Sequence, residues 1–131
     1  MMNDLDEMAA VYKVAQVYFD ALYYADAARM AEVMLPAAVY ATTAEGDLLH
    51  RTQPEYLAVL AKREPPADRK ETRRDKVVSV QFAGRSTALV VANCAIGDRY
   101  FTDLLTLVQL RGRWWIIAKV FDFERLEERA A

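Results

Sequence analysis

Two aspartates near the C-terminus are the strongest candidates for chemistry in this sequence. Asp103 and Asp122 stand in two long apolar stretches that are separated by a short turn sequence. In a regular hairpin with a two-residue turn at Gly112 and Arg113, the two aspartates lie opposite each other on one face. Carboxylates so placed repel, so one is expected to hold a proton near neutral pH and to act as an acid beside a base. A salt bridge from Asp122 at the strand end is the alternative interpretation.

Lys119 and His50 are further titratable candidates. The same hairpin register places Lys119 on the face opposite to Asp103, with its stem packed there; a lysine facing a pocket is the alternative. His50, the only histidine, is either a surface residue or a general base at a pocket rim. One histidine and one cysteine, Cys94, give no zinc-ligand cluster, and no glycine-rich phosphate loop is present. We therefore expect no metal and no cofactor.

Aromatic residues are candidates for the lining of a cavity. Phenol and indole groups suit a flat, partly polar ligand such as a pterin-like or other aromatic ring. Ordinary core packing explains the same residues, and the sequence leaves both interpretations open. The first interpretation predicts a small aromatic or heterocyclic ligand in contact with Tyr18, Tyr40, His50, Tyr56 and Trp114.

The elements that position these residues follow from hydrophobic spacing and turn signals. Apolar residues at helical spacing predict helices over residues 4–24, 27–35 and 54–63. Pro36 is expected to end the second helix, and Thr52 with Glu55 matches a capping box for the third. Strands are predicted over residues 37–43, 48–51, 76–82, 87–96, 99–110 and 114–123. Helices followed by an antiparallel meander indicate an α+β class.

Composition limits the classes of function. The 131 residues are 54% hydrophobic, which is enough for the core of one compact domain. The net charge of −2 offers no concentrated basic surface, so we expect no nucleic-acid partner. We also expect no membrane partner, because no apolar run approaches the roughly 18 residues that span a bilayer. A single cysteine and an acidic N-terminal segment without the apolar region of a signal peptide favour the cytoplasm.

Both faces of the predicted hairpin are rich in apolar residues, and helices can cover only one of them. The face that carries Asp103 has small residues in the neighbouring strand, which leaves room for a cavity under the helices. Left in water, the other face would exceed the apolar patch that monomers usually expose. We therefore expect a homodimer through this outer face, formed by Leu104, Val108, Trp115, Ile117, Lys119 and Phe121.

Two stretches resemble a known family: YFDALYYADAARMAEVMLPAAVY near the start and FTDLLTLVQLRGRWWIIAKVF near the end. They resemble the nuclear transport factor 2-like (SnoaL-like) superfamily and, within it, the putative lumazine-binding family. The resemblance implies one cone-shaped domain over residues 1–131, with three N-terminal helices packed on a curved antiparallel sheet. The chain departs from the family pattern at Asp122 and Leu35, where the family carries histidines.

Three functions are compatible with the sequence, because the superfamily contains isomerases, dehydratases, polyketide cyclases and non-catalytic binders. The first is a small-molecule-binding protein with a conical pocket lined by aromatic residues and carboxylates. The second is an enzyme of the isomerase, dehydratase or cyclase kind that uses Asp103 and Asp122 as acid and base. The third is a protein-interaction module whose cone is filled by side chains.

Overall fold

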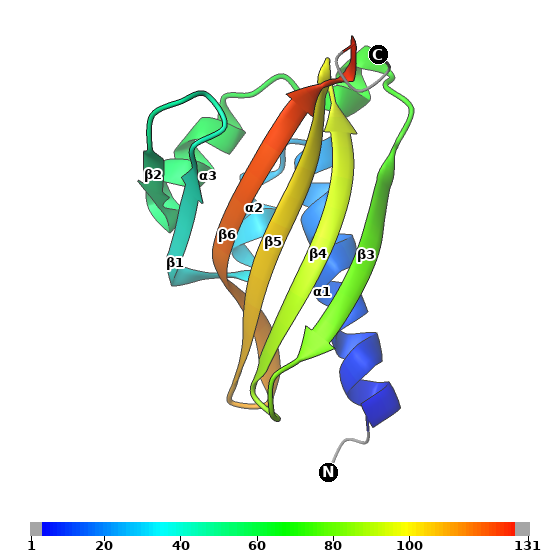
Figure 1. The fold of residues 1–131 in the computed structure, drawn as a ribbon, viewed down its shortest axis with the longest axis vertical. Helices are drawn as coiled ribbons and strands as arrows, with labels where there is room; N and C mark the ends of the chain where they lie inside the picture. Colours follow the sequence, from blue (N-terminus) through cyan, green and yellow to red (C-terminus); the bar gives the residue numbers. More distant parts are fainter. Residues whose placement is uncertain (1–3, 128–131) are drawn as a thin grey trace.

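Helices pack on one face of a curved six-stranded sheet in the computed structural model, which describes residues 4–127 (Figure 1). Residues 1–3 of the N-terminal segment considered above lie outside the described residues. The helices are α1 (Asp4–Tyr23), α2 (Ala27–Ala31), α3 (Gln53–Ala61) and the 3-10 helix η1 (Pro66–Arg69). The strands are β1 (Met34–Thr42), β2 (Leu49–Thr52), β3 (Asp75–Phe82), β4 (Thr87–Ile96), β5 (Arg99–Leu110) and β6 (Arg113–Arg125). The predicted α+β class is confirmed.

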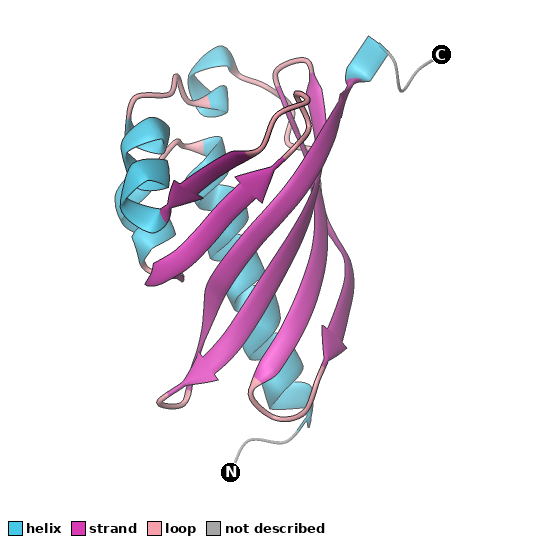
Figure 2. Ribbon diagram, turned by 60° about the vertical axis from the view of Figure 1, so that its left-hand side comes forward, coloured by secondary structure: helices cyan, strands magenta, loops and turns pink. Residues whose placement is uncertain are grey.

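The sheet has the strand order β2-β1-β6-β5-β4-β3 and does not close into a barrel (Figure 2). The meander from β3 to β6 is antiparallel, as the sequence predicts, but β1 pairs with β6 in parallel. The hydrophobic core lies between the inner face of the sheet and the helices. None of the helices in the described part of the chain is both long and apolar enough to cross a membrane.

The second helix is shorter than its sequence predicts. It ends at Ala31, and β1 already begins at Met34, so Pro36 lies inside a strand instead of ending a helix. The register of β1 against β6 shifts between Met34 and Val39, which places Pro36 where its missing N–H interrupts no regular ladder. By contrast, the capping box of α3 is confirmed, since the side chains of Thr52 and Glu55 cap it reciprocally.

The hairpin of β5 and β6 has a different register from the predicted one. Leu110 pairs with Arg113, so the turn consists of Arg111 and Gly112, with φ values of 53° and 77°. Positive φ at both central residues is typical of a type I′ turn, whose twist matches the strands. The turn predicted at Gly112 and Arg113 therefore lies one residue nearer the N-terminus. This error alone shifts the pairing by two positions and leaves every side chain on its expected face.

A bulge in β6 then moves the rest of that strand to the other face. Leu107 pairs with Ile116 and Thr106 with Ala118, which leaves one residue of β6 unpaired between them. Beyond the bulge, Asp103 lies opposite Phe121 rather than Asp122. The predicted pair of facing carboxylates is therefore wrong.

The bulge also corrects the predicted outer face. Lys119 and Phe121 were placed on that face, but both are buried on the inner side, with 5% and 8% of their surfaces exposed. Val120, which is 45% exposed, and Asp122 take the outward positions instead. Leu104 is 42% exposed, as expected of an outer-face residue, whereas Val108, Trp115 and Ile117 are partly buried.

Candidate ligand-binding site

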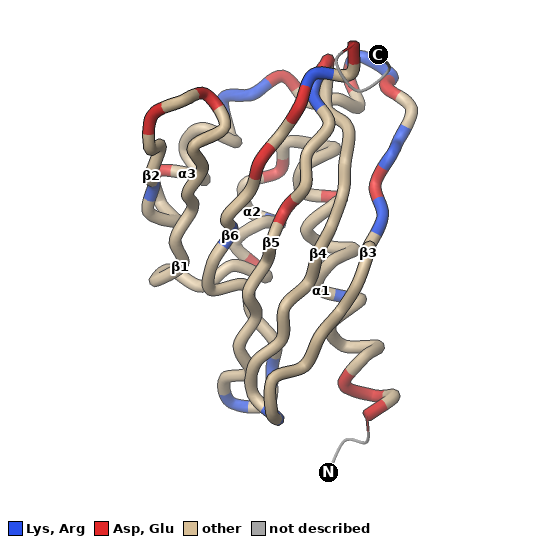
Figure 3. Tube along the Cα trace, viewed as in Figure 1, with Lys and Arg blue, Asp and Glu red and all other residues tan. Residues whose placement is uncertain are grey.

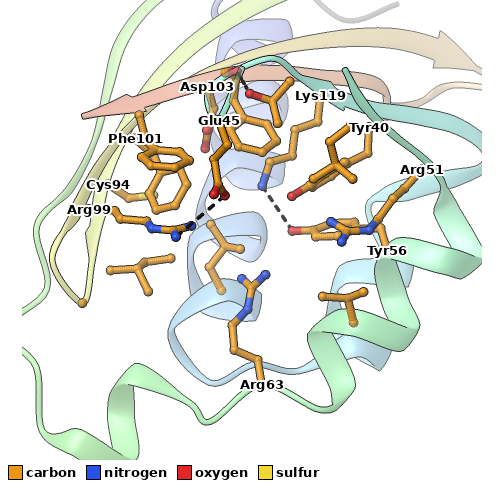
Figure 4. Close-up of a pocket in the computed structure, with 18 of the residues that line it drawn as sticks. Tyr40, Glu45, Arg51, Tyr56, Arg63, Cys94, Arg99, Phe101, Asp103 and Lys119 are labelled. Carbon is orange, nitrogen blue, oxygen red and sulfur yellow. Dashed lines mark hydrogen bonds and ion pairs between the residues drawn. The ribbon is translucent and has the colours of Figure 1, made fainter. Parts of the chain in front are cut away.

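A cavity of about 380 Å³ lies between the inner face of the sheet, α1 and α3, near the β1–β2 and β4–β5 turns (Figure 4). This volume is within the range of small-molecule sites. Its walls are largely aromatic and apolar, and they include Leu22, Tyr40, Tyr56, Phe101, Phe121 and Phe123. Two charged groups, Asp103 from β5 and Lys119 from β6, form its floor.

Asp103 is almost completely buried, with 1% of its surface exposed. The hydroxyl of Tyr18, from the buried face of α1, donates a hydrogen bond of 2.5 Å to its Oδ2 atom. Its Oδ1 atom has no hydrogen-bond partner within residues 4–127. Burial raises the pKa of Asp103, against the charge of Lys119 and the hydrogen bond from Tyr18, which both lower it. Burial and the nearby carboxylate also raise the pKa of Tyr18, so its hydroxyl keeps its proton as the donor.

The ammonium group of Lys119 lies in a cage of aromatic rings. Its Nζ atom is 5.0 to 5.5 Å from the ring centres of Tyr18, Tyr40, Tyr56 and Phe121, within the range of cation–π attraction. It donates one hydrogen bond, of 3.2 Å, to the hydroxyl of Tyr56. Burial opposes the charge, but the neighbouring Tyr56 and Asp103 outweigh it and hold the pKa of Lys119 above its usual range. The lysine is therefore a cation at neutral pH.

Local structure explains how these residues meet. Tyr40 of β1 is the direct partner of Lys119 in the parallel β1–β6 ladder, so the two side chains leave the sheet side by side. Leu105 of β5 is the partner of Lys119 across the antiparallel ladder, two residues from Asp103 on the same face. The capping box at the start of α3 fixes the helix that brings Tyr56 over the cavity.

The mouth of the cavity carries several arginines, drawn from different elements. Arg51 of β2 stacks over the ring of Tyr40, with 5.2 Å from its guanidinium carbon to the ring centre. Arg99 at the start of β5 lies 3.8 Å from a carboxylate oxygen of Glu45 in the β1–β2 turn. Arg63, just after α3, points toward the same space (Figure 4). The rim is thus more basic than the chain as a whole.

The structure brings together only some of the candidate residues. Tyr40, Tyr56 and Asp103 line the cavity. Tyr18 is not part of the lining but donates a hydrogen bond to Asp103. Asp122 lies on the outer face, exposed, where its Oδ1 accepts a hydrogen bond from the next backbone N–H.

Two other candidates lie away from the cavity. His50 is exposed on β2 and is not part of the lining. Trp114 is buried near the hairpin turn, where its Nε1 atom donates a 2.8 Å hydrogen bond to Glu7 and its ring packs edge-on against Phe82.

Sequence reasoning missed two parts of this site: Lys119 and the arginines of the mouth. The alternative that Lys119 faces a pocket was open, but a regular ladder favoured the wrong face. Arg51, Arg63 and Arg99 are separated in sequence and gather only through the fold, so no local pattern signals them.

The arrangement is suited to binding through hydrogen bonds and charge. Within the described part of the chain, Lys119 has spare hydrogen-bond donors and Asp103 has a spare acceptor. Burial and the charge of Asp103 raise the pKa of Cys94 in the cavity wall, so its thiol is not a nucleophile at neutral pH. No group of three or more histidine, cysteine, aspartate or glutamate side chains within residues 4–127 is arranged to hold a metal ion.

Comparisons with solved structures place this fold in the nuclear transport factor 2-like class. One such protein of unknown function, from Silicibacter pomeroyi, superposes with a TM-score of 0.84 at 21% identity, covering 94% of this chain and all of that one. Another, from Shewanella baltica, has a TM-score of 0.84 at 17% identity, covering 95% and 98% of the two chains. A ketosteroid isomerase-like protein from Erwinia carotovora atroseptica has a TM-score of 0.71 at 13% identity, with 93% and 98% covered. At these identities the likeness shows the fold alone.

The family model described as putative lumazine-binding matches residues 6–122. The chain therefore belongs to the putative lumazine-binding family. No protein of curated function matches the sequence.

Proposed function

We propose that this protein binds a small, flat organic molecule in the conical cavity. One observation carries the proposal: among residues 4–127, the floor of the cavity holds a buried carboxylate oxygen without a partner, beside a buried lysine that uses one of its three donors. Leaving such groups unsatisfied costs about 1–3 kcal/mol each, which a floor built for packing alone would avoid. A ligand that pairs with both groups removes this penalty.

The chemistry of the floor favours a ring with a lactam edge. Such an edge presents an N–H donor and a carbonyl acceptor side by side, as Oδ1 of Asp103 and Nζ of Lys119 require. The aromatic walls around Tyr40, Phe101 and Phe121 suit the flat faces of such a ring. The family description names lumazine, a heterocycle with lactam edges, which agrees with this choice.

The two other functions receive less support. Acid–base catalysis by Asp103 and Asp122 requires both carboxyl groups in one site, and Asp122 is exposed on the opposite face. An interaction module with a filled cone has no use for an open cavity of about 380 Å³.

Thermal unfolding with lumazine and pterin as probes tests the proposal. A probe at about 100 times its dissociation constant is expected to add roughly 2.7 kcal/mol to the free energy of unfolding. In Asp103→Asn the amide oxygen still accepts the hydrogen bond from Tyr18, but the amide NH₂ group takes the place of Oδ1. A donor then faces the donor of the ligand, so we expect about tenfold weaker binding. Asp122→Asn removes the same charge from the outer face and is expected to leave affinity unchanged. Equal loss in both variants, or loss in Asp122→Asn alone, contradicts the assignment.

We also propose that the outer face of the sheet pairs with a second copy of the chain. Leu104 and Val120 are direct cross-strand partners, 42% and 45% exposed, and they form an apolar patch. The lower parts of β4, β5 and β6 contain few charged residues above the hairpin turn (Figure 3), so the apolar patch suits a second copy of the chain better than a charged partner. The outward residues Trp115 and Ile117 extend the patch toward that turn.

Sedimentation at micromolar concentration is expected to show a dimer for the wild type and a monomer for Leu104→Glu, because a buried unpaired charge opposes association. Leu5→Glu makes the same change on α1, where Leu5 is 80% exposed, and should remain dimeric. A monomeric wild type would rule out this interface.

A further inference from the structure

We propose that the ligand of the conical cavity is a planar acid, whose carboxylate binds to Arg51 and Arg63 at the mouth while its ring occupies the aromatic interior. This inference rests on the proposed function and adds the chemical class of the ligand. It follows from the charges around the mouth and from which of them already have partners.

Cations outnumber anions among the cavity-lining residues. The cations are Arg51, Arg63, Arg69, Arg99 and Lys119, and the anions are Glu45, Asp98 and Asp103. The chain as a whole has the opposite balance, with 17 basic and 19 acidic residues. A cleft with an excess of one sign attracts ligands of the other sign. The cavity therefore favours an anion even though the chain carries net negative charge.

Most of the charges at the rim are already paired. Arg99 lies 3.8 Å from Glu45. Asp98 receives a 2.9 Å hydrogen bond from Arg125, outside the cavity lining. Arg69 is 2.6 Å from one glutamate and 3.4 Å from a second, so its charge is already satisfied by Glu71 and Glu64. These residues shape the rim but leave no cation free for a ligand.

Arg51 and Arg63 are the exceptions. Neither forms a salt bridge or a hydrogen bond through its side chain with any residue between 4 and 127. The charge of Arg51 acts on the carboxylate of Glu55, but the two form no ion pair. Both side chains are partly buried and point into the cavity (Figure 4). Stacking on Tyr40 holds the planar guanidinium group of Arg51 in place, so this group loses little side-chain entropy when it binds a ligand.

The charge of Arg63 reaches the interior of the cavity. Burial raises the pKa of Tyr56, and the charges of Lys119 and Arg63 oppose that rise. Arg63 thus belongs to the same electrostatic environment as the floor, although it comes from the end of α3. Because Lys119, Arg51 and Arg63 line one cavity, we infer that a ligand in contact with Lys119 at its inner end meets Arg51 and Arg63 at its outer end. Guanidinium forks bind carboxylates by paired, charge-assisted hydrogen bonds.

Matched pairs of probes test this inference by isothermal titration calorimetry. We would measure pterin-6-carboxylate against pterin-6-carboxamide, and 2-naphthoate against 2-naphthamide, at low and high salt. The acid of each pair is expected to bind at least tenfold more tightly than its amide at low salt. Added salt should reduce that preference, because the mouth is open to solvent.

Arg51→Gln and Arg63→Gln should each weaken binding of the acids about five- to tenfold while changing the amides less than twofold. Lys13→Gln removes one positive charge from the exposed face of α1, outside the cavity, and should change neither. Equal affinity for acid and amide in the wild type would overturn the inference and leave the binding function standing. If neither member of either pair binds, both the inference and the proposed function fail.

Discussion

Replacing Lys119 with methionine is expected to lower the free energy of unfolding by about 3 kcal/mol at pH 8, and by much less at pH 4. Methionine keeps the apolar stem among the aromatic rings but removes the charge that lowers the pKa of Asp103. The folded-state pKa of Asp103 is already above its unfolded value of about 3.9, and it should rise further in the variant. A carboxyl group whose pKa is higher in the folded than in the unfolded state favours folding while it is protonated. That contribution to the free energy of unfolding is fully present below the pKa of the unfolded state and is lost as pH rises through the pKa of the folded state.

Urea unfolding between pH 4 and pH 8 measures this dependence. The double variant Lys119→Met with Asp103→Asn has no carboxyl group at the floor, so the additional loss above pH 4 should disappear. A loss in Lys119→Met of the same size at both pH values would show that packing around the side chain, and not the charge of Asp103, causes the effect.

Most of the fold could be predicted because it depends on local patterns. The capping box at Thr52, the turn at Gly97 and the alternation along β4 and β5 each signal their element directly. The β4–β5 register follows from that turn, and it correctly places Ala92 opposite Asp103 and Cys94 on the same inner face. These features need only a few neighbouring residues to specify them.

The position of Lys119 could not be predicted in this way, because a bulge is a property of two strands together. Near the turn the predicted face is right, and Ile116 is buried as expected. Beyond the extra residue, Lys119 and Phe121 turn inward and Asp122 turns outward. Each of these three assignments depends on that single residue, since a one-residue slip changes the face of every later side chain.

The corrected register also changes the meaning of the polar floor. Asp103 and Lys119 are both buried, and burial raises the pKa of Asp103 although Lys119 and Tyr18 act in the opposite direction. A polar group kept in the core against stability is a common property of functional sites. In the proposed site Asp103 is the only one of the two candidate aspartates that remains, and Lys119 takes the place of Asp122 as its charged neighbour.

Replacing Trp114 with alanine is expected to lower the free energy of unfolding by about 3–5 kcal/mol without changing the ligand affinity of the folded protein. The indole is 2% exposed, packs 5.8 Å from the ring centre of Phe82 and donates a hydrogen bond to Glu7. Its removal leaves a large cavity and a carboxylate without this donor, far from Lys119. Trp114 is buried beside Phe82 and Glu7 and is not among the residues that line the cavity, so we expect it to act through stability alone.

Trp114→Phe separates most of the packing contribution from the rest, because phenylalanine keeps an aromatic ring against Phe82 but loses the donor to Glu7 and part of the ring volume. We expect it to lose about 1–2 kcal/mol, less than half the effect of alanine. Chemical unfolding measures both variants, and calorimetric titration with the best-binding probe measures affinity below the unfolding transition. A tenfold loss of affinity in Trp114→Phe would instead show that the cavity extends to the hairpin turn, because a change confined to the far end of the core does not alter contacts at Asp103.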